Sequence, residues 1–226
     1  MGVSFDVVSI GCLSHNPFWN ERQPVRALHA TTTLIRDGVQ TILVDPSLPA
    51  ELLRHRLDER TGLKPEQITC VFLTSFQPDH RRSLNLFERA EWLMHETEIQ
   101  AYRDHLNRFL DVAQNKERDQ VDIIRQELEL LERIRRAPEK LTAAVHLFPT
   151  PGVTPGSCSL LLVPATTTVA VAGDAVVNRD YLEHGRVFER CSDAAQAAES
   201  LAELIEIADQ IVCGHDNVLI PQGRGL

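Results

Sequence analysis

Four short segments of the sequence hold most of the residues that could bind a metal ion or move a proton. Each follows a run of apolar and β-branched residues typical of a buried strand, so each is expected in a loop at a strand end. Loops at the ends of strands that point the same way meet in one cleft. The four segments are residues 74–80, 150–157, 172–175 and 213–215.

Four side chains in these segments are candidate metal ligands, namely Asp79, His80, Asp174 and His215. Asp79 and His80 are adjacent in a tight loop and can turn toward one point, whereas the other two arrive from distant strands. Two carboxylates and two imidazoles suit zinc, iron or manganese by donor type. We therefore expect one divalent metal ion, zinc in the first place, with iron or manganese as alternatives.

In order, spacing and context the four segments resemble the metal-binding motifs of the metallo-β-lactamase superfamily. Those motifs are a His-x-His-x-Asp-His loop, a Thr-Pro-Gly-His-Thr-Pro-Gly turn, a Gly-Asp pair and a late Gly-His pair. The resemblance covers nearly the whole chain and implies an α/β fold, a four-layer αββα sandwich. It also implies that Asp45, which follows the apolar run at residues 41–44, supports a metal ligand without binding the metal itself.

The same resemblance implies that the first of the family's two metal sites is missing. The three histidine positions of that site are occupied by Ser75, Gln77 and Val153. Serine is a poor metal ligand, glutamine a weak one, and valine has no lone pair to offer. The family's second site uses the four positions at which the candidate ligands stand, so a mononuclear centre is expected.

A single zinc ion can lower the pKa of bound water to about 7 if one coordination position stays open. The expected function is hydrolysis of a small ester, thioester, lactone or amide by metal-bound water, with Asp79 or Asp174 as the base. If all four ligands bind tightly, the site is closed and structural instead. The alternative function is therefore that of a non-catalytic member of the superfamily that binds a metal or a ligand.

Three further histidines are candidate substrate contacts at the mouth of the cleft. His15 lies in a turn, His29 precedes a strand, and His184 follows the Gly-Asp segment along the chain. Loop residues held by a rigid scaffold often contact substrates. Each of the three is nevertheless more often an ordinary surface or core residue than a binding residue.

The elements that must position these residues follow from the periodicity of apolar side chains. Helices are predicted at residues 50–61, 83–91 and 194–207. Strands are predicted at residues 5–10, 31–35, 41–44, 69–74, 92–95, 145–148, 159–163, 168–172 and 210–212.

A highly charged stretch at residues 97–140 interrupts the alternation of strands and helices. Its apolar residues recur at helical spacing, which predicts two amphipathic helices that turn back on each other at residues 114–117. The simplest interpretation is a solvated helical insert in a single domain that spans residues 1–226. The alternatives are a lid over the cleft or the surface of a homodimer.

Composition narrows the class of protein. The chain has 226 residues, of which 43% are hydrophobic and 24% charged, as in ordinary globular domains. A net charge of −9 disfavours nucleic-acid binding. The sequence shows no signal peptide and no membrane-spanning run, and its five cysteines are scattered. We therefore expect a cytoplasmic protein with a small-molecule substrate and no membrane partner.

Overall fold

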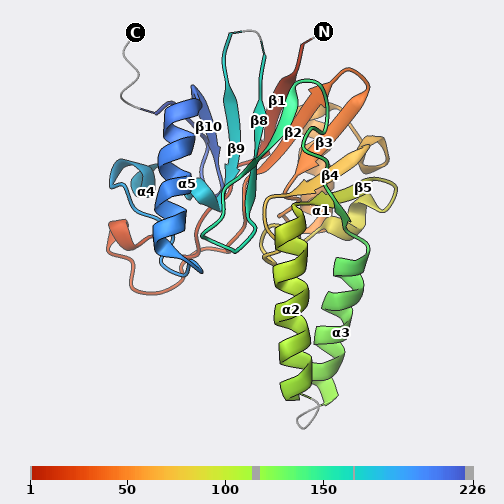
Figure 1. The fold of residues 1–226 in the computed structure, drawn as a ribbon. Coiled ribbons are helices and arrows are strands. Elements are labelled where there is room, and N and C mark those ends of the chain that lie inside the picture. The colour runs from red at the N-terminus through yellow and green to blue at the C-terminus, as the bar shows by residue number, and fades with distance from the viewer. Residues whose placement is uncertain (1, 114–117, 165, 222–226) are drawn as a thin grey trace.

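The structure is a computed structural model that describes residues 2–113, 118–164 and 166–221. It contains two β-sheets that lie face to face (Figure 1). The first sheet consists of β1 (Ser4–Ser9), β2 (Thr32–Asp37), β3 (Gln40–Val44), β4 (Cys70–Leu73), β5 (Glu91–Met94) and β6 (Arg135–Arg136). These strands lie in chain order; β1 to β3 are antiparallel, and β3 to β6 run parallel.

The second sheet has the order β11-β10-β9-β8-β7, and β9 and β10 form its parallel pair. Its strands are β7 (Val145–Pro149), β8 (Cys158–Leu162), β9 (Val169–Gly173), β10 (Gln210–Cys213) and β11 (Val218–Leu219). The helices are α1 (Ala50–Thr61), α2 (Glu96–Ala113), α3 (Arg118–Glu132), α4 (Arg179–Glu183) and α5 (Ala194–Ile207). Within the described ranges, no helix is long and apolar enough to cross a membrane.

Three apolar clusters separate the layers. Phe72 of β4 packs with Leu160 and Val171 of the second sheet, so this cluster lies between the two sheets. On the outer face of the first sheet, Leu53 and Leu57 of α1 are fully buried in a second cluster. The third cluster lies between the second sheet and α5. The order is helix, sheet, sheet, helix, which confirms the predicted four-layer αββα sandwich.

Two helices begin and end where the sequence predicts. Gly62 ends α1 in the left-handed conformation, with φ of 68°, which a glycine adopts without steric cost. Asp193 begins α5 because its carboxylate accepts a hydrogen bond from the backbone N–H of Gln196 at 3.0 Å. Local signals of this kind can be read from the sequence alone.

The helix predicted at residues 83–91 is wrong. Only a short 3-10 turn, Leu84–Phe87, forms there, and β5 begins at Glu91. Leu84 and Phe87 are both buried, so a single turn already places the two apolar side chains in the core. The Trp92 indole then donates a hydrogen bond to the carbonyl of Phe87 at 2.9 Å, which binds the turn to the strand.

The charged stretch forms the two predicted helices, α2 and α3, which pack against each other and project away from the sheets (Figure 1). The predicted turn at residues 114–117 lies outside the described residues. Phe109, Val112 and Ile123 are exposed on this hairpin. A homodimer through the hairpin stays a prediction, as does the lid.

Candidate metal centre

The candidate ligands come from both sheets. Asp174 follows β9 and His215 follows shortly after β10, and these two strands are parallel neighbours in which Cys213 pairs with Gly173. The loop that carries Asp79 and His80 leaves β4 of the first sheet. Because the carboxyl ends of these strands meet at one edge of the sandwich, residues far apart in the chain lie side by side.

Three distances describe the cluster. His215 Nε2 lies 3.1 Å from Asp174 Oδ1, and His80 Nε2 lies 3.3 Å from Asp174 Oδ2. His215 Nε2 lies 3.7 Å from Asp79 Oδ2. Asp79, His80 and His215 each present one donor atom, and these three atoms lie within 4.8 Å of one another. The structure therefore brings all four candidate ligands together.

The atoms that face the centre of this cluster lack hydrogen-bond partners in the part of the chain that the structure describes. These atoms are His80 Nε2 and both carboxylate oxygens of Asp174, and all three are buried. A buried polar atom left unsatisfied costs about 1–3 kcal/mol, so three around one point are expensive. A divalent cation would accept lone pairs from these oxygen and nitrogen atoms, so the residues present fit a metal ion.

The outward nitrogens of both imidazoles are held in place. His80 Nδ1 lies 3.0 Å from Asp45 Oδ2, and His215 Nδ1 lies 2.9 Å from the backbone carbonyl of His29. Such contacts leave Nε2 of each ring directed at the cluster and fix its tautomer. Asp45 is itself fixed, because Thr74 donates its backbone N–H and its hydroxyl to the carboxylate, at 2.9 and 2.6 Å.

Two glycines allow the close approach of the strand ends. A Cβ on Gly173, whose φ is 54°, would lie 2.5 Å from Thr74 Oγ1. A Cβ on Gly214 would lie 2.4 Å from Asp174 Oδ1. A larger residue in place of either glycine, in the Gly-Asp pair or in the Gly-His pair, would therefore clash at the candidate metal centre.

Attraction between the imidazoles and the carboxylates of the cluster favours the charged form of each. Burial alone would lower the pKa of His80, but the carboxylates of Asp174 and Asp45 outweigh it and raise that pKa well above its usual range. Burial would raise the pKa of Asp174, but the imidazoles of His80 and His215 outweigh it and lower that pKa. Protons and a metal ion therefore compete for the same nitrogens.

Residues 25–215 of the chain match the sequence profile of the metallo-beta-lactamase superfamily. The chain belongs to this superfamily. The match spans all four segments of the cluster, and the two-sheet sandwich described above is the fold that the resemblance implied.

Solved structures show the same metallo-beta-lactamase fold at low sequence identity. A metallo-beta-lactamase candidate from Thermotoga maritima superposes with a TM-score of 0.71 and 20% identity, over 98% of this chain and 100% of that one. The dizinc quorum-quenching lactonase AidC gives 0.67 and 15%, over 84% and 74%. AiiA of B. thuringiensis, with N-decanoyl-L-homoserine bound, gives 0.64 and 18%, over 96% and 94%. No curated protein matches the sequence.

In this metallo-beta-lactamase superfamily protein, two of the three positions of the expected first site, Gln77 and Val153, line a cavity of about 450 Å³. Ser75 and Val153 are buried, and Gln77 is half-buried. The Ser75 hydroxyl lies 3.4 Å from the backbone N–H of Gln77, so it is engaged within its own loop. That these three positions form a vacated metal site stays a prediction.

A buried carboxylate connects the two segments that carry these three positions. Glu98, in the first turn of α2, is fully buried. One oxygen accepts a hydrogen bond from the backbone N–H of Phe76 at 3.1 Å, and the other from the N–H of Gly156 at 3.0 Å. The Thr154 hydroxyl lies 2.8 Å from both oxygens. Glu98 thus links the loop at residues 75–77 to the turn at residues 150–157.

Sequence reasoning missed Glu98 because it assigned the charged residues of this amphipathic helix to its solvated face. A signal was present: Glu98, Tyr102 and Leu106 follow one another at intervals of four, so the acid lies on the apolar stripe of its own helix. Burial raises the pKa of Glu98 above its ordinary value. An acid at such a position is buried only when donors surround it.

Arg81 was missed as well, and it attaches α3 to the ligand loop, residues 74–80, which carries Asp79 and His80. Its Nε donates to the carbonyl of Phe76 at 2.7 Å, and its guanidinium lies 3.9 Å from the centre of the Phe76 ring. The same guanidinium pairs with Glu127 of α3. Both helices of the hairpin are therefore bound to the loop that carries Asp79 and His80.

Access to the cluster is one-sided. His80 is fully buried, and the residues Asp174 and His215 are 5% and 4% exposed, whereas the side chain of Asp79 is 12% exposed. Asp79 also lines a cavity of about 730 Å³ whose wall includes Arg82, just after the loop at residues 74–80, and Gln126, Glu127 and Leu130 of α3. The open side of the cluster thus faces the helical hairpin.

The three histidines predicted as substrate contacts lie in different settings. The His29 ring is bound to backbone carbonyls of Ala27 and Ile10, at 2.9 and 3.1 Å. His184 stacks on Phe18 with ring centres 4.4 Å apart. His15 is half-buried in the loop before the short 3-10 turn Pro17–Trp19. Only His29 touches the cluster in the contacts described, through its backbone carbonyl, so contact with substrate stays a prediction for all three.

Proposed function

We propose that this chain is a mononuclear metal-dependent hydrolase of a small ester, thioester, lactone or amide. The observation that carries the proposal is the convergence of unsatisfied buried donor atoms from His80 and Asp174 with His215 and Asp79. Asp79, His80 and His215 would hold the ion, with Asp174 as a weaker fourth ligand between the two imidazoles. Zinc is the first candidate, and iron or manganese would suit the same donors.

A divalent ion bound there would supply Lewis acidity and lower the pKa of water at the site to about 7. The protein's own part is proton transfer and positioning. Asp79 is the ligand residue that lines the cavity, so it can reach a proton on a substrate or a water molecule. Asp174 is enclosed by two imidazoles and would orient them. We therefore assign the base to Asp79 ahead of Asp174.

The cavity at Asp79 supports a small substrate. Its volume of about 730 Å³ lies in the range of sites for small molecules, and α3 forms one wall. AidC and AiiA, which share the fold, are a lactonase and a protein that binds N-decanoyl-L-homoserine. A lactone or ester of comparable size is accordingly the first substrate class to test.

The test is turnover by protein whose metal content is known. Protein loaded with one equivalent of zinc is assayed on phenyl and p-nitrophenyl esters, γ- and δ-lactones, a thioester and an anilide. We expect metal-dependent turnover that falls to background in His215→Ala and by about 100-fold or more in Asp79→Asn. His55→Ala, an exposed change on α1, is the matched control. A folded, zinc-loaded protein inert on the whole panel would contradict the proposal.

A second candidate is a non-catalytic protein whose ion is structural. The observation in its favour is the near-complete burial of His80, Asp174 and His215. In that case chelation lowers the melting temperature, while no compound of the panel is turned over. Metal-dependent turnover, lost in His215→Ala, would exclude this candidate.

A further inference from the structure

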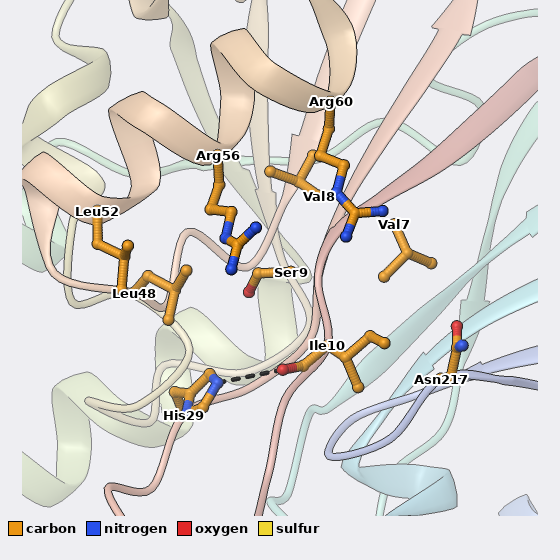
Figure 2. Close-up of a pocket in the computed structure, with 10 residues that line it drawn as sticks. All are labelled: Val7, Val8, Ser9, Ile10, His29, Leu48, Leu52, Arg56, Arg60 and Asn217. Carbon is orange, nitrogen blue, oxygen red and sulfur yellow. Dashed lines mark hydrogen bonds between the residues drawn. The ribbon is translucent and has the colours of Figure 1, made fainter.

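A second cavity lies between α1 and the first strand of the sandwich, apart from the cavity at Asp79. Its volume is about 430 Å³, and the ligand loop at residues 74–80 contributes nothing to its lining. Figure 2 shows its walls: α1 on one side, the segment at residues 7–10 on the other, and His29 and Asn217 on either side of Ile10. It is lined by Val7, Val8, Ser9, Ile10, His29, Leu48, Leu52, Arg56, Arg60 and Asn217.

Two arginines give this cavity its charge. Arg56 and Arg60 are one helical turn apart on α1, and their guanidinium groups point toward the segment at residues 7–9 (Figure 2). Arg56 bonds to Glu59 at 2.9 Å on the exposed side of the helix. Arg60 has no ion-pair partner in the described part of the chain. Two like charges at this spacing repel each other, and an anion between them would relieve that repulsion.

Guanidinium groups select the chemistry of the anion. Their planar donors match the geometry of a carboxylate or a phosphate and bind it through two parallel hydrogen bonds. The hydroxyl of Ser9, which also lines this cavity (Figure 2), is buried and has no hydrogen-bond partner among the described residues. It is available as a further donor.

The rest of the cavity is apolar. Of the lining residues, Val8 and Leu48 are buried, while Ile10 and Leu52 are 48% and 46% exposed. Large apolar side chains left open beside two cations match a molecule with an apolar body and an anionic head. A bare inorganic anion would leave these side chains in water.

We propose that this cavity is a second binding site, which takes a small amphiphilic anion with a carboxylate or phosphate head and a short alkyl body. The site does not depend on whether the metal centre is catalytic. Its two halves are separate in the sequence, because the arginines come from α1 and the apolar strand segment comes from β1 and the residue that follows it. No motif of the superfamily resemblance includes either half.

The test is calorimetric titration of the zinc-loaded full chain with octanoate, octyl phosphate and 1-octanol. We expect saturable binding of one equivalent of octanoate or octyl phosphate, and at least tenfold weaker binding of 1-octanol. Binding of only one of the two anions would support the site and identify its head group. Equal binding of 1-octanol, or binding of neither anion, would overturn the proposal.

Variants locate the binding. The double change Arg56→Gln with Arg60→Gln should weaken anion binding at least tenfold. Arg60→Gln alone should weaken the binding by a smaller factor. Arg54→Gln is the matched control, because Arg54 is on the same helix but pairs with Glu66 outside the cavity. An anion held at the metal centre would bind the double variant as tightly as it binds the wild type, and this result would refute the second site.

Discussion

Nε2 of His80 lies 3.3 Å from Oδ2 of Asp174, and both atoms are buried without a hydrogen bond. An apolar replacement would have been cheaper at such a position, since unpaired buried polar groups are costly. The pair is therefore best explained by a cation that both atoms contact. The same pair explains why chelation should destabilise the whole fold, because the two residues follow strands of different sheets.

We expect metal removal to destabilise the wild-type protein and Asp174→Asn to abolish most of this effect. An amide offers one oxygen in place of two, so metal affinity falls and one donor group is left between the imidazoles. Melting temperatures with zinc and with excess chelator give the comparison. Asp58→Asn, an exposed change on α1, should behave as wild type. A chelator effect of wild-type size in Asp174→Asn would contradict a metal at this place.

Asp45→Asn should weaken metal binding by about 10- to 100-fold, as found when the hydrogen-bond partner of a ligating histidine is removed. The change is well matched, because Asp45 has φ of 52° and asparagine tolerates this left-handed conformation. A competition titration against a zinc-chelating dye measures the effect. Unchanged zinc affinity, with the fold intact, would show that Asp45 stabilises the loop and does not orient His80 for metal binding.

Glu98→Gln should change how stability depends on pH. The pKa of Glu98 is raised by burial, so between about pH 4.5 and its folded pKa the unfolded chain has lost a proton that the native protein keeps. Native stability relative to the variant therefore falls as the pH rises through this window and levels off above it. Urea unfolding of both chelated proteins from pH 4.5 to 8 tests this. A difference that stays constant or grows with pH would contradict it.

Val153→His should fail to create a first metal site. Val153 is buried in the turn that Glu98 binds through Thr154, and a larger, polar ring there should cost about 1–3 kcal/mol. We expect the free energy of unfolding to drop and the zinc content to stay at one ion per chain. Val153→Leu controls for size alone. A second bound zinc would show that the first site is only dormant.

How far the sequence predicts this molecule depends on the range of the interactions. The ends of α1 and α5 were predictable because Gly62 and Asp193 act within a few residues of themselves. The convergence of Asp174 and His215 was predictable because parallel strands end at the same edge. The helix expected at residues 83–91 was wrong because burial of Leu84 and Phe87 within one turn outweighed local helical preference. Glu98 and Arg81 were missed because their partners lie in other segments, and only packing reveals that their charges are enclosed.

The link made by Glu98 has a mechanical consequence. One carboxylate on α2 holds both the loop at residues 75–77 and the turn at residues 150–157. Any displacement of α2 would therefore act on both segments at once.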